Sequence, residues 1–161
     1  MKKEYPHSPV TASCHDVSMD ALMPLMLERL AAGQKVRFAP RGVSMLPMLR
    51  QGRDCVILSP VPEKLKKYDL PLYRLDSGKY LLHRVVRVGQ TYSCRGDNLY
   101  LTETGLRHDQ MLALVTGFTR DGKLYSVDAR PYRLYCRIWY YSFPLRKLGH
   151  RVLGKLGRWR K

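Results

Sequence analysis

The order of apolar and polar residues changes character twice along this chain. Between residues 18 and 33, large apolar residues recur at helical spacing: Leu22, Leu25, Met26 and Leu30. Ser18 is a suitable N-cap and Gly33 a suitable C-terminal stop, so the pattern predicts a helix over 18–33. Pro24 predicts a kink in this helix or marks its true first turn. Residues 1–17 are polar and are predicted to form a flexible arm.

From residue 34 to residue 128 the apolar pattern shortens to runs typical of strands. These runs are KVRFAP (35–40), DCVILSPV (54–61), DLPLYRL (69–75), KYLLHRVVRV (79–88), TYSCRG (91–96), MLALVTGFTR (111–120) and KLYSVD (123–128). The DSG at 76–78 and the DG at 121–122 each lie between two runs and predict hairpin turns. The range 34–128 therefore predicts one antiparallel β domain, built as coiled sheets or a barrel.

The pattern changes again over 129–161, where ten of the 29 lysines and arginines lie and no acidic residue occurs. The first part of this segment is aromatic, and beyond Pro144 apolar residues recur every three or four positions. This predicts a basic amphipathic helix, weakened by three glycines. Three roles stay open, in order of preference: a peripheral anchor on an anionic membrane, a helix packed on the β domain, and a nucleic-acid patch.

Composition narrows the class of protein. The 161 residues suffice for one domain with a core, and 45% hydrophobic and 26% charged residues indicate a globular chain. The net charge of +16 favours anionic partners. The cysteines, Cys14, Cys55, Cys94 and Cys136, lack zinc-site spacing and are expected to be buried free thiols in a reducing compartment. No metal or cofactor is therefore expected.

Targeting signals also bear on where the chain works. No run reaches the eighteen or so apolar residues of a membrane span, and the N-terminus has no apolar region typical of a signal peptide. We therefore expect a cytoplasmic protein, with any membrane contact peripheral and on the inner face.

The segment RGVSMLPML (41–49) holds the most suggestive polar residue of the chain, Ser44. A serine becomes a nucleophile only when a neutral base lies within hydrogen-bond reach. Gly42 suits the tight turn that an oxyanion site needs, and Pro47 can stiffen its exit.

His83 is the best candidate base. In a single strand it would share a face with Leu81 and Val85, where partial desolvation favours the neutral imidazole. A core histidine bonded to backbone is the alternative.

Four segments in order carry a family resemblance: GVSMLPML (42–49), GRD (52–54), LLHRVVRV (81–88) and RGDN (95–98). Together they resemble the serine peptidases that include signal peptidase I and the LexA-like repressors, most closely the histidine-using signal peptidases of the archaeal and endoplasmic-reticulum type. The resemblance covers roughly residues 36–118. It implies a mainly β fold with a LexA/signal-peptidase-like coiled sheet or barrel core, flanked here by an N-terminal helix and a C-terminal basic amphipathic helix.

The resemblance also assigns roles to residues of this chain. Ser44 matches the nucleophile, with its own backbone N–H as an oxyanion donor, and His83 matches the general base. Asp97 matches an aspartate that buttresses the site, and Glu103 stands where an acidic residue orients the histidine. Asp97 and Glu103 both stay candidates for that orienting role, with Glu103 preferred. The substrate and oxyanion turn comprises Gly42, Val43, Met45 and Pro47.

The resulting expectation is a serine endopeptidase with an acid-assisted Ser/His dyad. It would cleave a peptide, leader or signal segment of a protein substrate and would have no transmembrane anchor of its own. One alternative is a self-cleaving regulator of the LexA-like branch. Another is a non-catalytic module that binds membrane or nucleic acid through the basic segment 130–161.

Overall fold

The computed structural model describes residues 19–158, and the side chains up to residue 150. Its helices are α1 (Met19–Ala31), α2 (Arg130–Tyr141) and α3 (Phe143–Arg158), with a short 3₁₀ turn at His108–Gln110. Its strands are β1 (Val36–Phe38), β2 (Cys55–Ser59), β3 (Pro71–Arg74), β4 (Tyr80–Leu82), β5 (Arg84–Val88), β6 (Tyr92–Arg95), β7 (Glu103–Leu106), β8 (Met111–Arg120) and β9 (Lys123–Ser126). The predicted arm at 1–17, the Ser18 cap and Cys14 lie outside this range.

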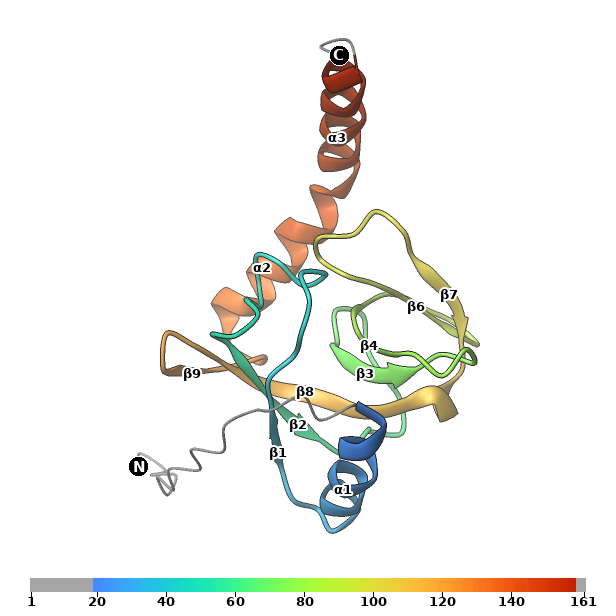
Figure 1. The fold of residues 1–161 in the computed structure, drawn as a ribbon, viewed down its shortest axis with the longest axis vertical. Coiled ribbons are helices and arrows are strands. Elements are labelled where there is room, and N and C mark those ends of the chain that lie inside the picture. Colours follow the sequence, from blue (N-terminus) through green and yellow to red (C-terminus); the bar gives the residue numbers. More distant parts are fainter. Residues whose placement is uncertain (1–18, 159–161) are drawn as a thin grey trace.

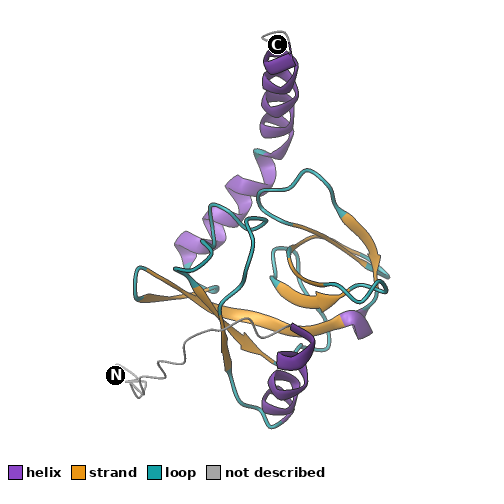
Figure 2. Ribbon diagram, viewed as in Figure 1, coloured by secondary structure: helices purple, strands orange, loops and turns teal. Residues whose placement is uncertain are grey.

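The strands form two antiparallel sheets, which confirms the expectation of a mainly β protein (Figure 2). The larger sheet has the order β1-β2-β8-β3-β4, with β9 paired to β8, and the smaller has the order β5-β6-β7. Within residues 19–158 the sheets stay open, so the barrel option is wrong. The long strand β8 crosses the middle of the molecule (Figure 1). It joins the two halves of the larger sheet by pairing with both β2 and β3.

Both predicted hairpin turns are present. Asp121 and Gly122 have φ of 50° and 76° and connect β8 to β9, as a two-residue turn of type I′ requires. The second turn, around Gly78, connects β3 to β4, and the Gly78 N–H donates to the carbonyl of Leu75 at 2.8 Å. Turn residues that tolerate positive φ thus determined both strand pairings locally.

The predicted N-terminal helix is α1, which packs on the larger sheet. It begins at Met19 and runs through Pro24, so the alternative that Pro24 marks its first turn is wrong. The helix ends where predicted: Gly33 has φ 73°, its N–H donates to Leu30, and the next N–H donates to Arg29. This pair of hydrogen bonds satisfies the last carbonyls of the helix.

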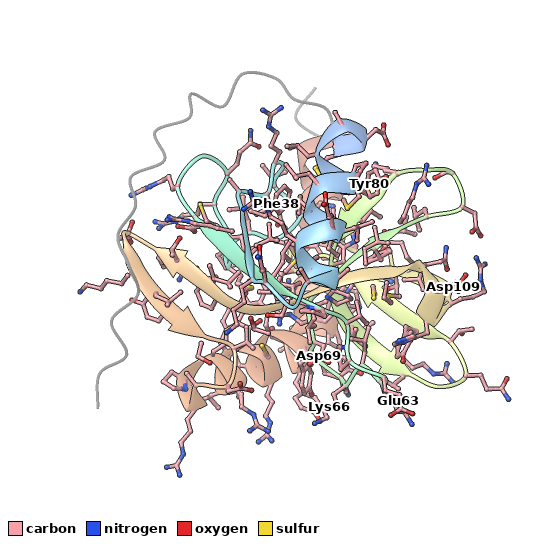
Figure 3. All side chains as sticks on the ribbon, turned by 90° about the horizontal axis from the view of Figure 1, so that it is seen from below. Phe38, Glu63, Lys66, Asp69, Tyr80 and Asp109 are labelled. Carbon is pink, nitrogen blue, oxygen red and sulfur yellow. The ribbon has the colours of Figure 1, made fainter. Side chains whose placement is uncertain are left out.

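The main core lies between α1 and the larger sheet. Met23, Met26 and Leu30 of the helix are buried against sheet residues such as Val56 and Leu58. Phe38 and Tyr80, which flank α1 in Figure 3, pack on the edge of this cluster. A second, smaller core lies against the β5-β6-β7 sheet and includes Tyr73, Val85, Cys94 and Leu106.

The run 79–88 is not the single strand that its composition predicts. It breaks at His83, so that β4 belongs to the larger sheet and β5 to the smaller one. Arg84 and Val85 are both buried, and a register shift follows between Val85 and Arg87. The expected alternation, with Leu81, His83 and Val85 on one face of one strand, is therefore wrong. A strand that changes sheets turns its side chains at the corner.

The basic segment forms two helices, whereas one amphipathic helix was predicted. α2 ends at Tyr141 and is capped by Ser142, whose N–H donates to the Ile138 carbonyl, and α3 begins at Phe143. α2 lies along the body of the molecule, and α3 extends from it, at the opposite end of the long axis from α1 (Figure 1). Tyr132 and Tyr135 pack against the main core, so part of this segment takes the core-packing role that was the second preference.

Candidate active site

Ser44 lies in a tight turn between β1 and β2. Gly42 has φ 96°, a conformation that side chains disfavour, and its N–H donates to the Gln51 side-chain oxygen at 2.7 Å. The Gly42 N–H is therefore engaged within the loop. The Ser44 N–H has no acceptor among the residues that the structure describes. This leaves the Ser44 N–H as the one of these two donors that can hold an oxyanion.

The other three residues of the predicted turn, Met45, Pro47 and Val43, differ in burial and in contacts. Met45 is buried in the main core, where it anchors the turn. Pro47 contributes its carbonyl, which accepts a hydrogen bond from Arg120 at 2.9 Å. Val43 is exposed beside Ser44. Of these three side chains, Val43 and Pro47 are exposed and can meet a substrate, whereas Met45 cannot.

The RGDN segment closes onto the serine turn from the other side. The Asn98 N–H donates to the Ser44 carbonyl at 2.8 Å, and the Asn98 side chain donates to the Val43 carbonyl at 3.2 Å. Gly96 lies so close that a Cβ there would come within 2.6 Å of the Ser44 carbonyl oxygen. Glycine and asparagine at these positions therefore hold the backbone of the serine turn in place.

His83 lies at the corner between the two sheets and is almost fully buried. Its Nδ1 lies 3.1 Å from Oε2 of Glu103, at the start of β7, and 3.2 Å from the Tyr73 hydroxyl of β3. The Tyr73 hydroxyl also donates to Glu103 Oε2 at 3.4 Å. The side chains of Tyr73 from β3 and Glu103 from β7 thus meet at one ring nitrogen of His83, which lies between β4 and β5.

Strand register explains how these three residues come together. Tyr73 pairs with Leu81 across the β3–β4 hairpin, and His83 follows two residues later, at the corner where the chain leaves the larger sheet. Glu103 pairs with Cys94 across the β6–β7 ladder. The contact between His83 and Glu103 is therefore a contact between the two sheets, which the resemblance suggested and local sequence pattern does not reveal.

Tyr73 was missed by sequence reasoning, because a tyrosine in a strand such as PLYRL carries no signal beyond core packing. Burial, with the nearby Cys94 and Glu103, raises the pKa of the Tyr73 hydroxyl well above its usual value. Tyr73 therefore remains a neutral hydrogen-bond donor. Burial beside Glu103 likewise raises the pKa of Cys94 to about 12, so this cysteine is a thiol at neutral pH and not a competing nucleophile.

This arrangement favours one tautomer of the imidazole. A carboxylate can only accept hydrogen bonds, so a proton on Nδ1 of His83 would be held by Glu103. The neutral ring would then carry its lone pair on Nε2, the nitrogen that can accept a proton. No hydrogen bond joins Ser44 to His83 within the described part of the chain. Such bonds are often long before substrate binds.

Asp97, the other candidate for orienting His83, lies elsewhere. Its carboxylate forms a double hydrogen bond with Arg84, at 2.8 Å from Nε and 2.7 Å from Nη2. Tyr135 of α2 donates to the same carboxylate at 3.0 Å, and Trp139 and Arg146 donate to the Asp97 backbone carbonyl. Asp97 therefore ties the RGDN segment to β5 and to the C-terminal helices.

A small cavity of about 80 Å³ opens at the serine turn. Ser44, Gly42 and Met45 line one side, and Tyr80, Leu81 and Leu82 of β4 line the other. The serine turn and the strand that leads into His83 therefore share a surface. A larger cavity of about 430 Å³ lies between α2 and residues 66–70 and contains none of the predicted site residues.

Among residues 19–158, no three His, Cys, Asp or Glu side chains gather as a metal site would need. None of the helices in that range combines the length and apolar character needed to cross a bilayer. Cys94 and Cys136 are buried free thiols, as predicted, whereas the burial predicted for Cys55 is wrong, because this free thiol is only half-buried. Comparison with protein-family models and with curated proteins found no match.

Proposed function

We propose that this protein is a serine endopeptidase in which Ser44 is the nucleophile, His83 the general base and Glu103 the residue that orients the base. The observation that carries the proposal is the 3.1 Å contact between His83 Nδ1 and Glu103 Oε2. A buried histidine with one nitrogen held by a carboxylate has the other nitrogen available for proton transfer, as in Ser-His-acid triads on other folds.

The proposed reaction follows from these positions. Ser44 Oγ attacks the scissile carbonyl while His83 Nε2 takes its proton, and the Ser44 N–H supports the oxygen that becomes negative. His83 then returns the proton to the leaving amine, which departs and leaves an acyl-serine. Water, deprotonated by the same His83 nitrogen, hydrolyses the ester and restores Ser44. Glu103 stabilises the charged imidazole in both steps.

The fold that we propose is the coiled-sheet fold of the signal peptidases and LexA-like repressors. Three features support this assignment by their order along the chain. They are the serine turn, the corner between the two sheets that carries the proposed base, and the GDN segment that closes on the serine turn. The substrate that we propose is a peptide or a segment of a protein.

The experiment is digestion of a mixed peptide library, followed by mass spectrometry, with the full chain and its Ser44→Ala variant. We expect new peptide ends with the wild-type chain and loss of cleavage by about 10³-fold or more in the variant. Ser77→Ala, an exposed serine in the β3–β4 turn, is the matched control and should keep full activity.

The proposal fails if Ser44→Ala cleaves as fast as the wild-type chain while both have the same melting temperature. The intact mass of the protein after prolonged incubation serves as a second readout. Loss of a defined fragment of its own chain, with no cleavage of added peptides, would instead assign the self-cleaving regulator.

A further inference from the structure

The two C-terminal helices expose a continuous apolar row. Five large side chains on α2 and α3 are between 58% and 73% exposed: Leu134, Ile138, Tyr141, Leu145 and Leu148. We call these five residues the apolar stripe. Their spacing of four, three, four and three residues places them along one side of a helix. The stripe therefore continues past the break at Ser142.

The opposite side of α2 is occupied by the protein itself. Cys136 is buried, the Tyr135 hydroxyl donates to Asp97, and the Trp139 indole donates to the Asp97 carbonyl at 2.8 Å. Arg146 at the start of α3 donates to the same carbonyl and lies 3.9 Å from the centre of the Trp139 ring. These contacts fix α2 and the first turn of α3, so the leucines and isoleucine of the apolar stripe face away from the β sheets. Tyr141, also largely exposed, lies at the edge of the stripe, where its ring centre is 5.9 Å from the Lys67 ammonium.

Basic residues accompany the stripe. Arg130, Arg133 and Arg137 are exposed on α2, and on a helical wheel all three fall on the same flank of the stripe. Residues 129–161 contain no acidic residue, and none of these three arginines forms an ion pair within the described part of the chain. A solvated surface helix would not need five exposed large apolar side chains in a row, since such patches mark interaction sites.

We propose that the apolar stripe is the docking surface for an anionic lipid bilayer, with the helices lying in the plane of the interface. Leucine, isoleucine and tyrosine side chains would enter the boundary between headgroups and acyl chains, while the arginines on the flank contact lipid phosphates. This proposal does not depend on the proposed peptidase activity.

Two other occupants fit the surface less well. A nucleic acid would need cations, not leucines, at the centre of the contact, because phosphates dominate its affinity. A second copy of the chain would place two helix pairs of equal positive charge side by side, with no acidic residue in either to offset the repulsion. A bilayer offers both an apolar interior and negative phosphates.

The test is co-sedimentation of the full chain with two kinds of vesicle. One kind is phosphatidylcholine alone, and the other adds roughly 30% phosphatidylglycerol to represent an anionic leaflet. We expect the wild-type chain to bind the anionic vesicles. Ile138→Glu combined with Leu145→Glu should lower the partition coefficient by about 100-fold or more, because it removes two inserted side chains.

The control variant carries the same charge change elsewhere. Leu25→Glu with Leu124→Glu replaces two exposed apolar residues, on α1 and β9, that lie outside the stripe. It should bind anionic vesicles within about threefold of the wild-type chain, since it changes the net charge equally but leaves the stripe intact. Arg133→Gln with Arg137→Gln should weaken binding to anionic vesicles and leave binding to neutral vesicles unchanged.

Three results would overturn the proposal. The first is equal loss of binding in the stripe variant and its control, which would reduce the effect to net charge. The second is absence of wild-type binding to the anionic vesicles at low salt. The third is binding of a DNA duplex or formation of a dimer in lipid-free solution that the stripe variant abolishes, which would assign the surface to that occupant.

Discussion

Two consecutive residues, His83 and Arg84, lead into two different regions of this molecule. Both side chains are almost fully buried and each meets one carboxylate. His83 meets Glu103, whose side chain is 18% exposed, through one contact of 3.1 Å. Arg84 meets Asp97, whose side chain is 2% exposed, through two hydrogen bonds of 2.7 and 2.8 Å. The His83–Glu103 pair is therefore partly accessible to solvent, whereas the Arg84–Asp97 pair is buried.

The difference shows how similar pairs of residues serve different purposes. A guanidinium stays charged at every physiological pH, so the Arg84–Asp97 pair can only hold structure together. It joins β5, the RGDN segment and α2 at a single point. An imidazole can gain and lose a proton near neutral pH, so the His83–Glu103 pair can take part in chemistry.

The largest effect should come from His83→Gln, which removes the proposed base. We expect cleavage of a substrate peptide to fall by about 10²- to 10⁴-fold in kcat/KM, the range that general base catalysis contributes. His108→Gln, at an exposed histidine on the 3₁₀ turn, is the control and should be as active as the wild-type chain. Equal activity of the two variants would mean that His83 is a core histidine only.

The next effect is on stability. Asp97→Ala should lower the free energy of unfolding, measured in urea, by about 3–5 kcal/mol, because it leaves the Arg84 charge buried without its partner. The double variant Arg84→Met with Asp97→Ala should be less destabilised than Asp97→Ala alone, since no buried charge remains. Asp109→Ala, at the edge of the molecule in Figure 3, serves as the exposed control. This account would be contradicted if the loss of stability in the double variant equalled the sum of the losses in Arg84→Met and Asp97→Ala.

A smaller loss, of catalytic activity, is expected for Glu103→Gln. The amide nitrogen can donate to His83 Nδ1 and so favour the ring tautomer with its proton on Nε2, which cannot take a proton from Ser44. We expect kcat/KM to fall by about 10²-fold, the lower end for general base catalysis, with little change in melting temperature. Glu63→Gln, an exposed glutamate labelled in Figure 3, should have no effect. Unchanged kinetics in Glu103→Gln would remove Glu103 from the site.

The smallest effect should belong to Tyr73→Phe. This change removes one hydrogen bond to the His83–Glu103 pair and keeps the ring in the core. We expect about 0.5–1.5 kcal/mol of lost stability and less than a tenfold change in kcat/KM. Tyr125→Phe, at an exposed tyrosine on β9, is the matched control. A loss as large as that of His83→Gln would give Tyr73 a direct part in proton transfer.

Features set by neighbouring residues were predicted well from the sequence. Gly33 ends α1, and Asp121 with Gly122 turns β8 into β9, because these conformations depend on the local backbone. All seven apolar runs contain strands for the same reason. β7 was not predicted: its sequence, ETGL, has too few apolar residues to stand out, yet it supplies Glu103.

The sequence by itself thus determined the class of fold and the presence of helices at both ends. It also supplied a short list of candidate catalytic residues, Ser44 and His83 among them. Only the tertiary structure decided that the run 79–88 breaks at His83, that Glu103 and Tyr73 meet that histidine, and that Asp97 belongs to Arg84. Turns and strand propensity act over a few residues. A contact between two sheets depends on register and on a chain corner, which are settled only when the whole core packs.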